Sequence, residues 1–317
     1  MKLAILMDPL SSLAAYKDST VAMIQSAHNL GWDCVYFTQS DLFCKEGRAY
    51  AAVSKIKVKD VTRSDWAEVT PVGERPLNSF DIILMRKDPP FDMEYIYATY
   101  ALELAEKEGV LVANKPQSLR DANEKFFTLN FPQCCPTTLV SSDINRLRDF
   151  WNKHRNVIFK PLEGMGGRSV FHVAEDGHNL SVILEVLTHS QTVSVMAQQY
   201  IPEISTLGDK RILLINGEPV PFGLARIPRP GELRGNLAAG AQGKVVPITD
   251  RDRWLCAEIA PTLKAKGLYF VGIDVIGDYL TEINVTSPTC IREIAAETGL
   301  DVAGDFLRCL AKLVNSR

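Results

Sequence analysis

Apolar and polar positions alternate in blocks over the first 120 residues, and each block has the length of a single strand or helix. Four short apolar runs predict buried strands, at 2–8, 33–38, 80–87 and 110–114. Two longer amphipathic stretches predict helices, at 18–31 and 92–109. Strands that alternate with helices form a parallel sheet covered by helices on both faces. The pattern therefore predicts a doubly wound first domain.

The pattern is weaker within segment 43–79, where it predicts strands near 50–58 and 65–70. After residue 126 the regular alternation gives way to closely spaced strands. Four of these are predicted, with helices after the first and third, at 136–142, 156–162, 169–174 and 193–200. From residue 210 onward, paired apolar strands joined by short turns predict an antiparallel sheet.

Composition narrows the class of protein. The chain has 317 residues, of which 46% are apolar and 23% charged, which is enough for two or three domains with cores of their own. A net charge of -3 argues against binding to nucleic acid or to an anionic membrane surface. No apolar run reaches the roughly 18 residues of a membrane helix. Seven cysteines without a C-x-x-C pair predict reduced thiols in a cytoplasmic protein.

The stretch YLTEINVTSPT at 279–289 carries polar residues in a strand that is otherwise apolar. Side chains alternate between the faces of a strand, so Glu282 and Asn284 share one face. If the strand pairs with 270–276 across a turn at Gly277, Asp274 lies beside Glu282. Two close carboxylates need a cation or a proton between them, and oxygen ligands favour Mg²⁺. The alternative is a surface hairpin whose polar residues face water, which the apolar composition disfavours.

A glycine-rich stretch, IFKPLEGMGGRSVF at 158–171, joins two further predicted strands. Gly164, Gly166 and Gly167 would let backbone amides approach an anion closely, and Lys160 ends the preceding strand. The stretch differs from the phosphate-binding loop that opens a helix. A plain hairpin turn remains the alternative, although a lysine that ends an apolar strand needs an anionic partner or solvent.

Two further stretches carry residues suited to nucleotide or carboxylate binding. The extended segment 195–202 places Gln198 and Gln199 where they could contact an adenine edge, and an ordinary strand end is the alternative. Arginines at 211, 226 and 234 suit carboxylate or phosphate, or belong to solvated loops. Segment 227–243 is longer than most loops in compact domains, which is typical of a functional segment.

Four blocks of sequence resemble a known family. They are LMRKDPPFDMEYIYATY at 84–100, NKPQSLRDANEKF at 114–126, RGNLAAG at 234–240 and LTEINVTSPTCIREI at 280–294. With the hairpin and the glycine-rich turn, they resemble the ATP-grasp superfamily and, within it, the prokaryotic glutathione synthetases. The resemblance covers essentially the whole chain.

The resemblance implies an α/β fold of the ATP-grasp type in three parts. These are an N-terminal doubly wound parallel-sheet domain, a small central lid domain and a C-terminal antiparallel-sheet catalytic domain, at 1–121, 122–201 and 202–317. The implied reaction joins γ-glutamylcysteine and glycine with ATP, through an acyl phosphate, to give glutathione, ADP and phosphate. It also implies a cytoplasmic homotetramer whose partners are these small molecules.

The family's functional positions match residues of this chain. Those implied to bind ATP are Lys125, Lys160, Gly164, Met165, Gly166, Gly167, Gln198, Gln199, Tyr200, Ile201 and Asp209. Those implied to hold two Mg²⁺ ions, which Mn²⁺ can replace, are Asp274, Glu282 and Asn284. Arg211, Arg226 and Arg234 are the implied catalytic residues. The implied peptide site is Arg86, Arg234, Asn236, Ser287, Pro288, Thr289 and Arg292.

Two positions depart from the family pattern, and two other functions are compatible with it. Arg168 stands where a smaller residue is commoner, and Ala241 stands in the lid segment where a second glycine is common. One alternative is another carboxylate–amine ligase of the superfamily, such as a D-alanine–D-alanine ligase or a glutamate-adding ligase. The other is a nucleotide-binding protein without ligase activity, which would be expected to lack one of the lysines, arginines or metal ligands.

Overall fold

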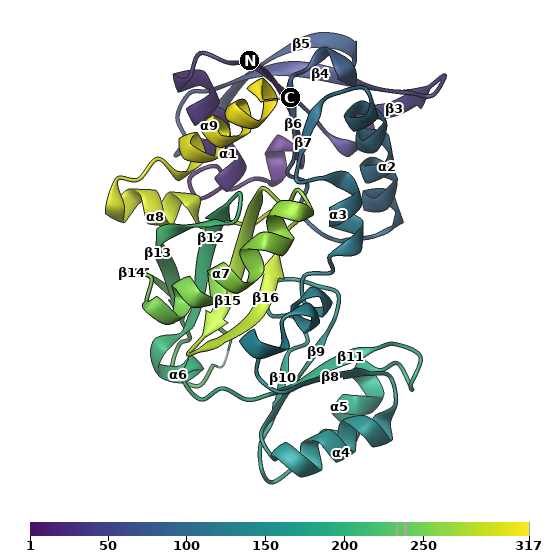
Figure 1. The fold of residues 1–317 in the computed structure, drawn as a ribbon, viewed down its shortest axis with the longest axis vertical. Helices are drawn as coiled ribbons and strands as arrows, with labels where there is room; N and C mark the ends of the chain where they lie inside the picture. Colours follow the sequence, from purple (N-terminus) through teal and green to yellow (C-terminus); the bar gives the residue numbers. More distant parts are fainter. Residues whose placement is uncertain (233, 238–239, 317) are drawn as a thin grey trace.

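The structure, a computed structural model, describes residues 1–232, 234–237 and 240–316. It is built on three β-sheets that follow one another along the chain, with helices packed on each (Figure 1). The first sheet lies at one end of an elongated molecule, the second at the other, and the third between them. Within the described ranges, every helix is too short or too polar to cross a membrane.

The first sheet contains the four parallel strands that the sequence predicts. They are β1 (Lys2–Leu6), β2 (Asp33–Phe37), β6 (Ile82–Met85) and β7 (Leu111–Ala113). The predicted helices are α1 (Ser19–Asn29) and α2 (Met93–Lys107). Their first turns are closed by Asp18 and Asp92, whose carboxylates accept hydrogen bonds from backbone N–H groups.

The same sheet continues into antiparallel strands, so it is mixed rather than wholly parallel. They are β3 (Leu42–Lys45), β4 (Arg48–Val58) and β5 (Ala67–Pro76). β4 pairs antiparallel with each of β2, β3 and β5, and its longest pairing is with β5. The sequence located β4 and β5 near their observed positions. Their direction was not predicted, because it depends on the strand that each one joins.

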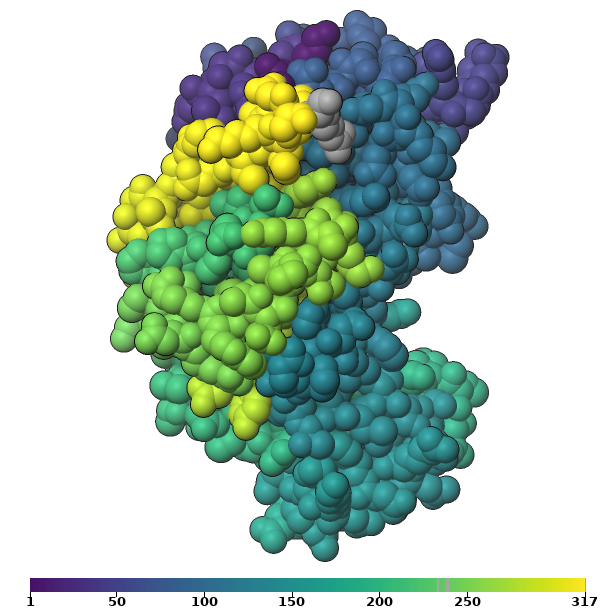
Figure 2. All heavy atoms as spheres, viewed as in Figure 1, coloured from purple at the N-terminus to yellow at the C-terminus, as the bar shows by residue number. Residues whose placement is uncertain are grey.

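The central part of the chain forms a small sheet covered by two helices. Its strands, in spatial order, are β10 (Phe171–Val173), β9 (Val157–Pro161), β11 (Val195–Gln199) and β8 (Thr138–Ser141). Its helices are α4 (Ile144–His154) and α5 (Leu180–Leu187). Leu147, Phe159 and Leu184 lie in its own hydrophobic core. This part therefore forms a separate lobe at the bottom of the molecule (Figure 2).

The third sheet is antiparallel, as predicted. Its strands, in spatial order, are β14 (Gln242–Pro247), β13 (Glu218–Ile227), β12 (Asp209–Ile215), β15 (Phe270–Ile276) and β16 (Tyr279–Asn284). Helix α7 (Asp250–Ala265) packs on this sheet. Two helices follow β16, namely α8 (Ile291–Thr298) and α9 (Val302–Asn315).

Short helices make the connections between these elements. They are α3 (Pro116–Asp121), α6 (Ile204–Leu207), η1 (Leu10–Ser12), η2 (Gln39–Asp41), η3 (Leu77–Ser79), η4 (Phe126–Asn130) and η5 (Pro132–Cys134). α3 and η4 belong to the linker that leads from β7 to the central lobe. This linker runs beside the third sheet, since η4 contacts β16.

The first and third sheets share their hydrophobic cores. One cluster joins Leu3 and Ile24 of the first part to Phe306 and Leu310 of α9. Helix α9 packs beside α1, and Ser26 donates a hydrogen bond to Asp301 at the start of α9. The two ends of the chain therefore meet in one body, from which the central lobe projects (Figure 1).

Candidate active site

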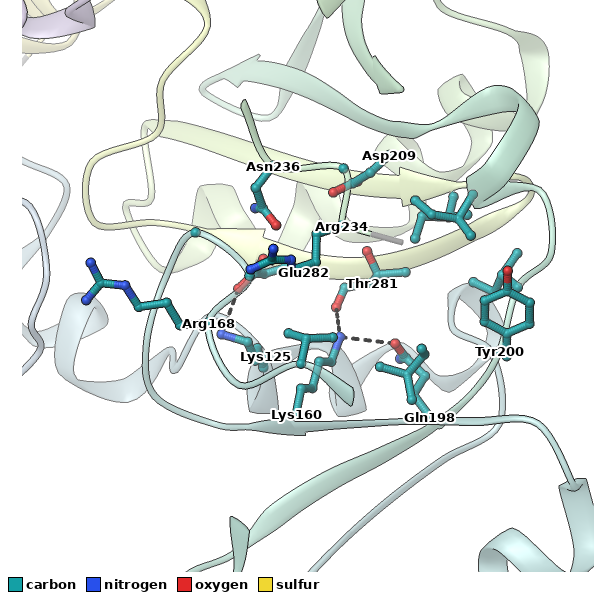
Figure 3. Close-up of a pocket in the computed structure, with 18 of the residues that line it drawn as sticks. Lys125, Lys160, Arg168, Gln198, Tyr200, Asp209, Arg234, Asn236, Thr281 and Glu282 are labelled. Carbon is teal, nitrogen blue, oxygen red and sulfur yellow. Dashed lines mark hydrogen bonds and ion pairs between the residues drawn. The ribbon is translucent and has the colours of Figure 1, made fainter. Parts of the chain in front are cut away.

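A cavity lies between the sheet of the central lobe and the third sheet, and residues from both line it (Figure 3). Every residue that the sequence assigned to ATP lines this cavity. They are Lys125, Lys160, Gly164, Met165, Gly166, Gly167, Gln198, Gln199, Tyr200, Ile201 and Asp209. Tyr200 lies at one end, Arg168 at the other, and Lys160 between them (Figure 3). Tertiary folding thus collects residues that are up to 84 positions apart.

Two lysines face the cavity from the central part of the chain. Lys160, at the end of β9, donates hydrogen bonds from Nζ to Gln198 Oε1 at 3.1 Å and to the Thr281 carbonyl at 3.3 Å. Burial lowers the pKa of Lys160, and nearby Glu282 opposes this shift. Lys125 Nζ lies 2.9 Å from the Gly164 carbonyl and 3.0 Å from Glu282 Oε1. Both ammonium groups therefore link the central lobe to β16.

The side chain of Gln198 forms hydrogen bonds with two other side chains. Its amide oxygen accepts from Lys160, and its Nε2 donates to Thr138 at 3.1 Å. The Gln198 side chain is thus occupied by protein partners, and the prediction that this segment contacts an adenine edge depends on its backbone N–H and C=O groups. The neighbouring Tyr200 ring stacks on His172, with 4.3 Å between the ring centroids.

The hairpin of β15 and β16 forms as the sequence predicts. Asp274 pairs with Glu282 and Gly272 with Asn284, and the turn lies at Gly277–Asp278. Asn284 donates from Nδ2 to the Gly272 carbonyl at 3.0 Å. Since paired residues on adjacent strands point to the same face, Asp274 and Glu282 lie side by side.

Arginines neutralise Asp274 from the neighbouring strands. Arg211 on β12 binds both of its carboxylate oxygens, and Arg226 on β13 lies 2.9 Å from Oδ2. Burial alone would raise the pKa of Asp274, but the two guanidinium groups hold it well below its usual range. Among the described residues, those that line the cavity include none of Asp274, Arg211 and Arg226, so this ion-paired cluster lies next to the cavity wall at Glu282.

Asp209 shares Arg226 with Asp274, since Arg226 Nη2 lies 2.6 Å from Asp209 Oδ2. The other oxygen, Oδ1, is buried without a hydrogen-bond partner in the described part of the chain. Burial, opposed by Arg226 and assisted by Asp274, raises the pKa of Asp209 to about 7. An unpartnered carboxylate oxygen beside the cavity has the chemistry to accept a hydroxyl hydrogen bond from a ligand.

The donor set on the hairpin fits a hard divalent cation by its chemistry. Asp274, Glu282 and Asn284 supply oxygens from one face of two adjacent strands. Within the described residues, no group of three His, Cys, Asp or Glu side chains is placed to hold a metal. The carboxylates instead bind Arg211, Arg226 and Lys125. A bound cation would therefore share these carboxylates with their basic neighbours.

The residues assigned to the peptide substrate fall into two places. Arg86 is buried and donates to the Pro288 carbonyl at 2.9 Å, while Ser287 Oγ lies 3.4 Å from the Arg86 carbonyl. Arg292 instead donates to the Asp18 carbonyl and to Gln25 Oε1. It thereby contacts α1 and the residue before it, and its predicted contact with substrate stays a prediction. It is the second residue of α8, and from there its side chain reaches the first domain.

The predicted lid is the connection between β13 and β14, whose ends pair at Ile227 and Gln242. Leu233, Ala238 and Ala239 of the RGNLAAG block and its surroundings lie outside the described residues. Arg234 and Asn236 line the cavity, and Arg234 is ion-paired with Glu232. Both lie against Gly167, where an added Cβ would clash with Asn236 Oδ1. The glycine-rich turn and this connection therefore touch each other over the cavity.

Comparison with known proteins decides the family. The model of the N-terminal domain of prokaryotic glutathione synthetase matches residues 1–120, and that of its ATP-grasp domain matches residues 124–299. The chain belongs to the prokaryotic glutathione synthetase family. Its activity is that of the family, the ATP-dependent synthesis of glutathione.

Curated relatives of this chain match over nearly their whole length. Glutathione synthetase of Pseudomonas putida KT2440 is 54% identical over 100% of this chain and 99% of its own. That of Escherichia coli O127:H6 is 52% identical over 96% of each chain, and that of Coxiella burnetii 48% over 98% and 96%.

Solved structures of other ATP-grasp ligases share the fold. D-cycloserine synthetase DcsG has a TM-score of 0.70 at 14% identity, covering 99% of this chain and 100% of its own. The ligase PsnB, solved with a minimal precursor, Mg and ADP, has a TM-score of 0.62 at 16% identity, covering 99% and 98%. At such identities the likeness concerns the fold alone, and it agrees with the predicted architecture.

Several residues of this site were not predicted. Thr281 and four apolar residues also line the cavity, namely Ile158, Val170, Ile204 and Ile276. Glu124 and Asn114 bind the chain around β16. Nothing in the sequence distinguishes these apolar residues from ordinary core positions. Glu124 precedes Lys125 within a block that was already noted, but nothing in that block identifies its partners.

Proposed function

We propose that the protein joins the cysteinyl carboxylate of γ-glutamylcysteine to the amine of glycine, through an acyl phosphate made from ATP. The observation that carries this proposal is the cavity that collects two lysines, the glycine-rich turn and Glu282, whose strand neighbour is Asp274. Nucleotide phosphates need basic side chains and backbone amides, and phosphoryl transfer is accelerated by positioning and charge stabilisation.

The first step transfers the terminal phosphoryl group. A carboxylate oxygen of γ-glutamylcysteine forms a bond to the γ-phosphorus while the bond to the leaving oxygen of ADP breaks. Lys125 and Lys160 contact the phosphate oxygens, and the turn of Gly164 to Gly167 covers them with Met165. Asp274, Glu282 and Asn284 would hold two Mg²⁺ ions, which supply charge neutralisation of the phosphates when bound.

The adenosine part extends toward the other end of the cavity. Gln198 to Ile201 would contact the base through their backbone, and the unpartnered oxygen of Asp209 would accept from a ribose hydroxyl. The apolar residues Ile158 and Ile276 would lie against the base, since both line this cavity. This places the phosphates beside Lys125 and Glu282, at the end nearer Arg168 (Figure 3).

The second step forms the amide bond. The amine nitrogen of glycine attacks the acyl carbon, loses a proton, and phosphate departs. Arg211 and Arg226, which face Asp274, and Arg234, which lines the cavity, are the basic groups that would stabilise the tetrahedral charge. Arg86 with Ser287, Pro288 and Thr289, together with Arg234 and Asn236, would hold the dipeptide. Segment 227–243 would exclude water from the acyl phosphate.

Phosphate release tests this proposal. The purified protein is supplied with ATP, Mg²⁺, γ-glutamylcysteine and glycine, and each is omitted in turn. The expected result is release that requires all four, with one glutathione formed per phosphate. Turnover with a different acid and amine, and none with this pair, would keep the ATP-grasp mechanism and overturn the assigned substrates. ATP binding without substrate-dependent release would overturn ligase activity.

We also propose that the protein works as a cytoplasmic homotetramer. All seven cysteines are free, which suits a reducing compartment. Met93, Tyr97 and Tyr100 on α2 are each more than half exposed, and they form one face of that helix. Large exposed apolar faces are typical of subunit contacts. Light scattering should give four chains per particle, and Tyr97→Lys should reduce that number without unfolding the chain.

A further inference from the structure

Strand β16 is the last strand of its sheet, and its outer edge is held by the linker rather than by another strand. In the described chain, β15 is its one strand partner. The amide of Ile283 donates to the Glu124 backbone carbonyl at 2.8 Å. Edge strands leave backbone donors unpaired unless something else satisfies them. The Glu124 carbonyl satisfies the amide of Ile283, which lies between Glu282 and Asn284.

The side chain of Glu124 continues this contact beyond the end of the strand. Its Oε1 accepts from the amides of Val285 and Thr286 at 2.8 and 3.0 Å, and from Thr286 Oγ1 at 2.8 Å. Three donors thus converge on one carboxylate oxygen across 162 positions of sequence. Removing an acceptor that serves three donors leaves those donors without a partner, which costs free energy.

Asn114 holds the same segment from the other end of the linker. Its Nδ2 donates to the carbonyls of Phe270 at 2.8 Å and Val285 at 2.7 Å, and its Oδ1 accepts from the Phe270 amide at 2.8 Å. Phe270 begins β15 and Val285 follows the end of β16. The amide side chain therefore closes the open end of the hairpin that carries Asp274 and Glu282.

The neighbour of Glu124 reaches the same strand from the cavity side. Lys125 Nζ lies 3.0 Å from Glu282 Oε1. Lys125 thus binds the Glu282 side chain of β16, while the preceding residue, Glu124, binds the backbone of the same strand. Beyond Thr286 the chain enters the turn of Ser287 and Pro288, which Arg86 binds. Any shift of residues 283–286 would move the hairpin carboxylates and this turn relative to Lys125.

We propose that Glu124 is a positioning residue, which sets the register of β16 and of the turn after it against the nucleotide cavity. Its effect on turnover rests on the function proposed above, whereas its effect on the backbone does not. The carboxylate acts through the acceptor oxygen that it presents. Glutamine presents an amide oxygen at the same place, so Glu124→Gln should preserve the arrangement and Glu124→Ala should remove it.

The test compares Glu124→Gln, Glu124→Ala and a control, Glu103→Ala, in the full-length protein. Glu103 is a partly buried carboxylate of the first domain, paired with Arg120 and outside the cavity. Three quantities are measured: hydrogen exchange of the amides of residues 283–286, ATP affinity with and without Mg²⁺, and kcat with γ-glutamylcysteine and glycine.

In Glu124→Ala, exchange at Val285 and Thr286 should become at least about tenfold faster, as expected when their amides lose their hydrogen-bond acceptor. The gain in ATP affinity that Mg²⁺ provides should fall, and kcat should drop by about tenfold or more. ATP affinity without Mg²⁺ should stay within about threefold. Glu124→Gln and Glu103→Ala should match the wild type within about threefold in every quantity.

Two results would overturn the inference. Unchanged exchange at 283–286 in Glu124→Ala would show that the carboxylate does not position this segment. A Glu124→Gln variant as impaired as Glu124→Ala, with normal exchange, would assign the effect to charge instead. If the wild type lacks turnover with this substrate pair, the proposed function fails, and the exchange measurement still decides the role of Glu124.

Discussion

The two sides of the cavity are built in opposite ways. On the side of the third sheet, Asp274 is buried and binds two arginines, and Glu282 is ion-paired with Lys125. On the side of the glycine-rich turn, Gly164, Gly166 and Gly167 have positive φ values, and Met165 is 52% exposed.

This difference separates two tasks. The sheet side holds charge in place before a ligand arrives, because buried ion pairs leave the carboxylates and arginines few alternative positions. The turn side offers backbone without side chains at its glycines, which leaves room for Arg234 and Asn236 and, in the proposed function, for phosphate oxygens. Substitutions on the two sides should therefore impair the protein for different reasons. On the sheet side, removing a charge should lower activity or stability. On the turn side, adding a side chain should weaken ATP binding.

The largest effect is expected at Glu282. Glu282→Gln keeps the shape of the side chain but removes one anionic ligand and the ion pair with Lys125. The rate of substrate-dependent phosphate release should fall by about 10²–10³-fold, the scale of losing one group that stabilises charge in the transition state. The thermal midpoint should change little, since this side chain is only partly buried. Near-normal release would contradict the assignment of Glu282 to the metal.

Asp274 should affect stability as well as activity. Asp274→Asn leaves Arg211 and Arg226 buried with one anion fewer, and breaking such a pair costs about 3–5 kcal/mol of unfolding free energy. Denaturant titration measures this loss. Asp305→Asn is the control, since its pair with Arg308 is exposed and should contribute less than about 1 kcal/mol. Equal losses of unfolding free energy in the two variants would show that the buried ion pairs stabilise the fold no more than an exposed pair does.

The contribution of Asp274 should also depend on pH. Its folded-state pKa lies below the unfolded value of about 3.9, so its stabilisation is complete above that value and is lost as the pH falls toward the folded-state pKa. The difference in unfolding free energy between wild type and Asp274→Asn should remain large at about pH 5–6 and shrink below about pH 4. A difference that grows on acidification would contradict this sign.

The smallest effect is expected on the turn side, where two glycines form a matched pair. Gly164 and Gly167 both have positive φ, but an added Cβ meets Asn236 only at Gly167, and at Gly164 it meets nothing within 4 Å. Gly167→Ala should raise the KM for ATP about tenfold above that of Gly164→Ala, the effect of losing roughly one charge-assisted hydrogen bond. Equal KM values would mean that backbone strain alone matters.

Much of this site could be predicted from the sequence. The period of two in β15 and β16 placed Asp274, Glu282 and Asn284 on one face, and Gly277 marked the turn between the strands. The resemblance located all the cavity residues assigned to ATP. These signals are local, because strand periodicity and turn chemistry act within a few residues.

The partners of the charged groups were decided by tertiary structure alone. Arg211 and Arg226 came to Asp274 from two other strands, Gln198 was taken by Lys160, and Arg292 turned to α1. Glu124 found its donors 161 and 162 positions away. Local pattern determines which face of a strand a side chain occupies. Which opposite charge or backbone amide meets it there depends on how distant segments pack, and that is set only when the sheets and the linker assemble.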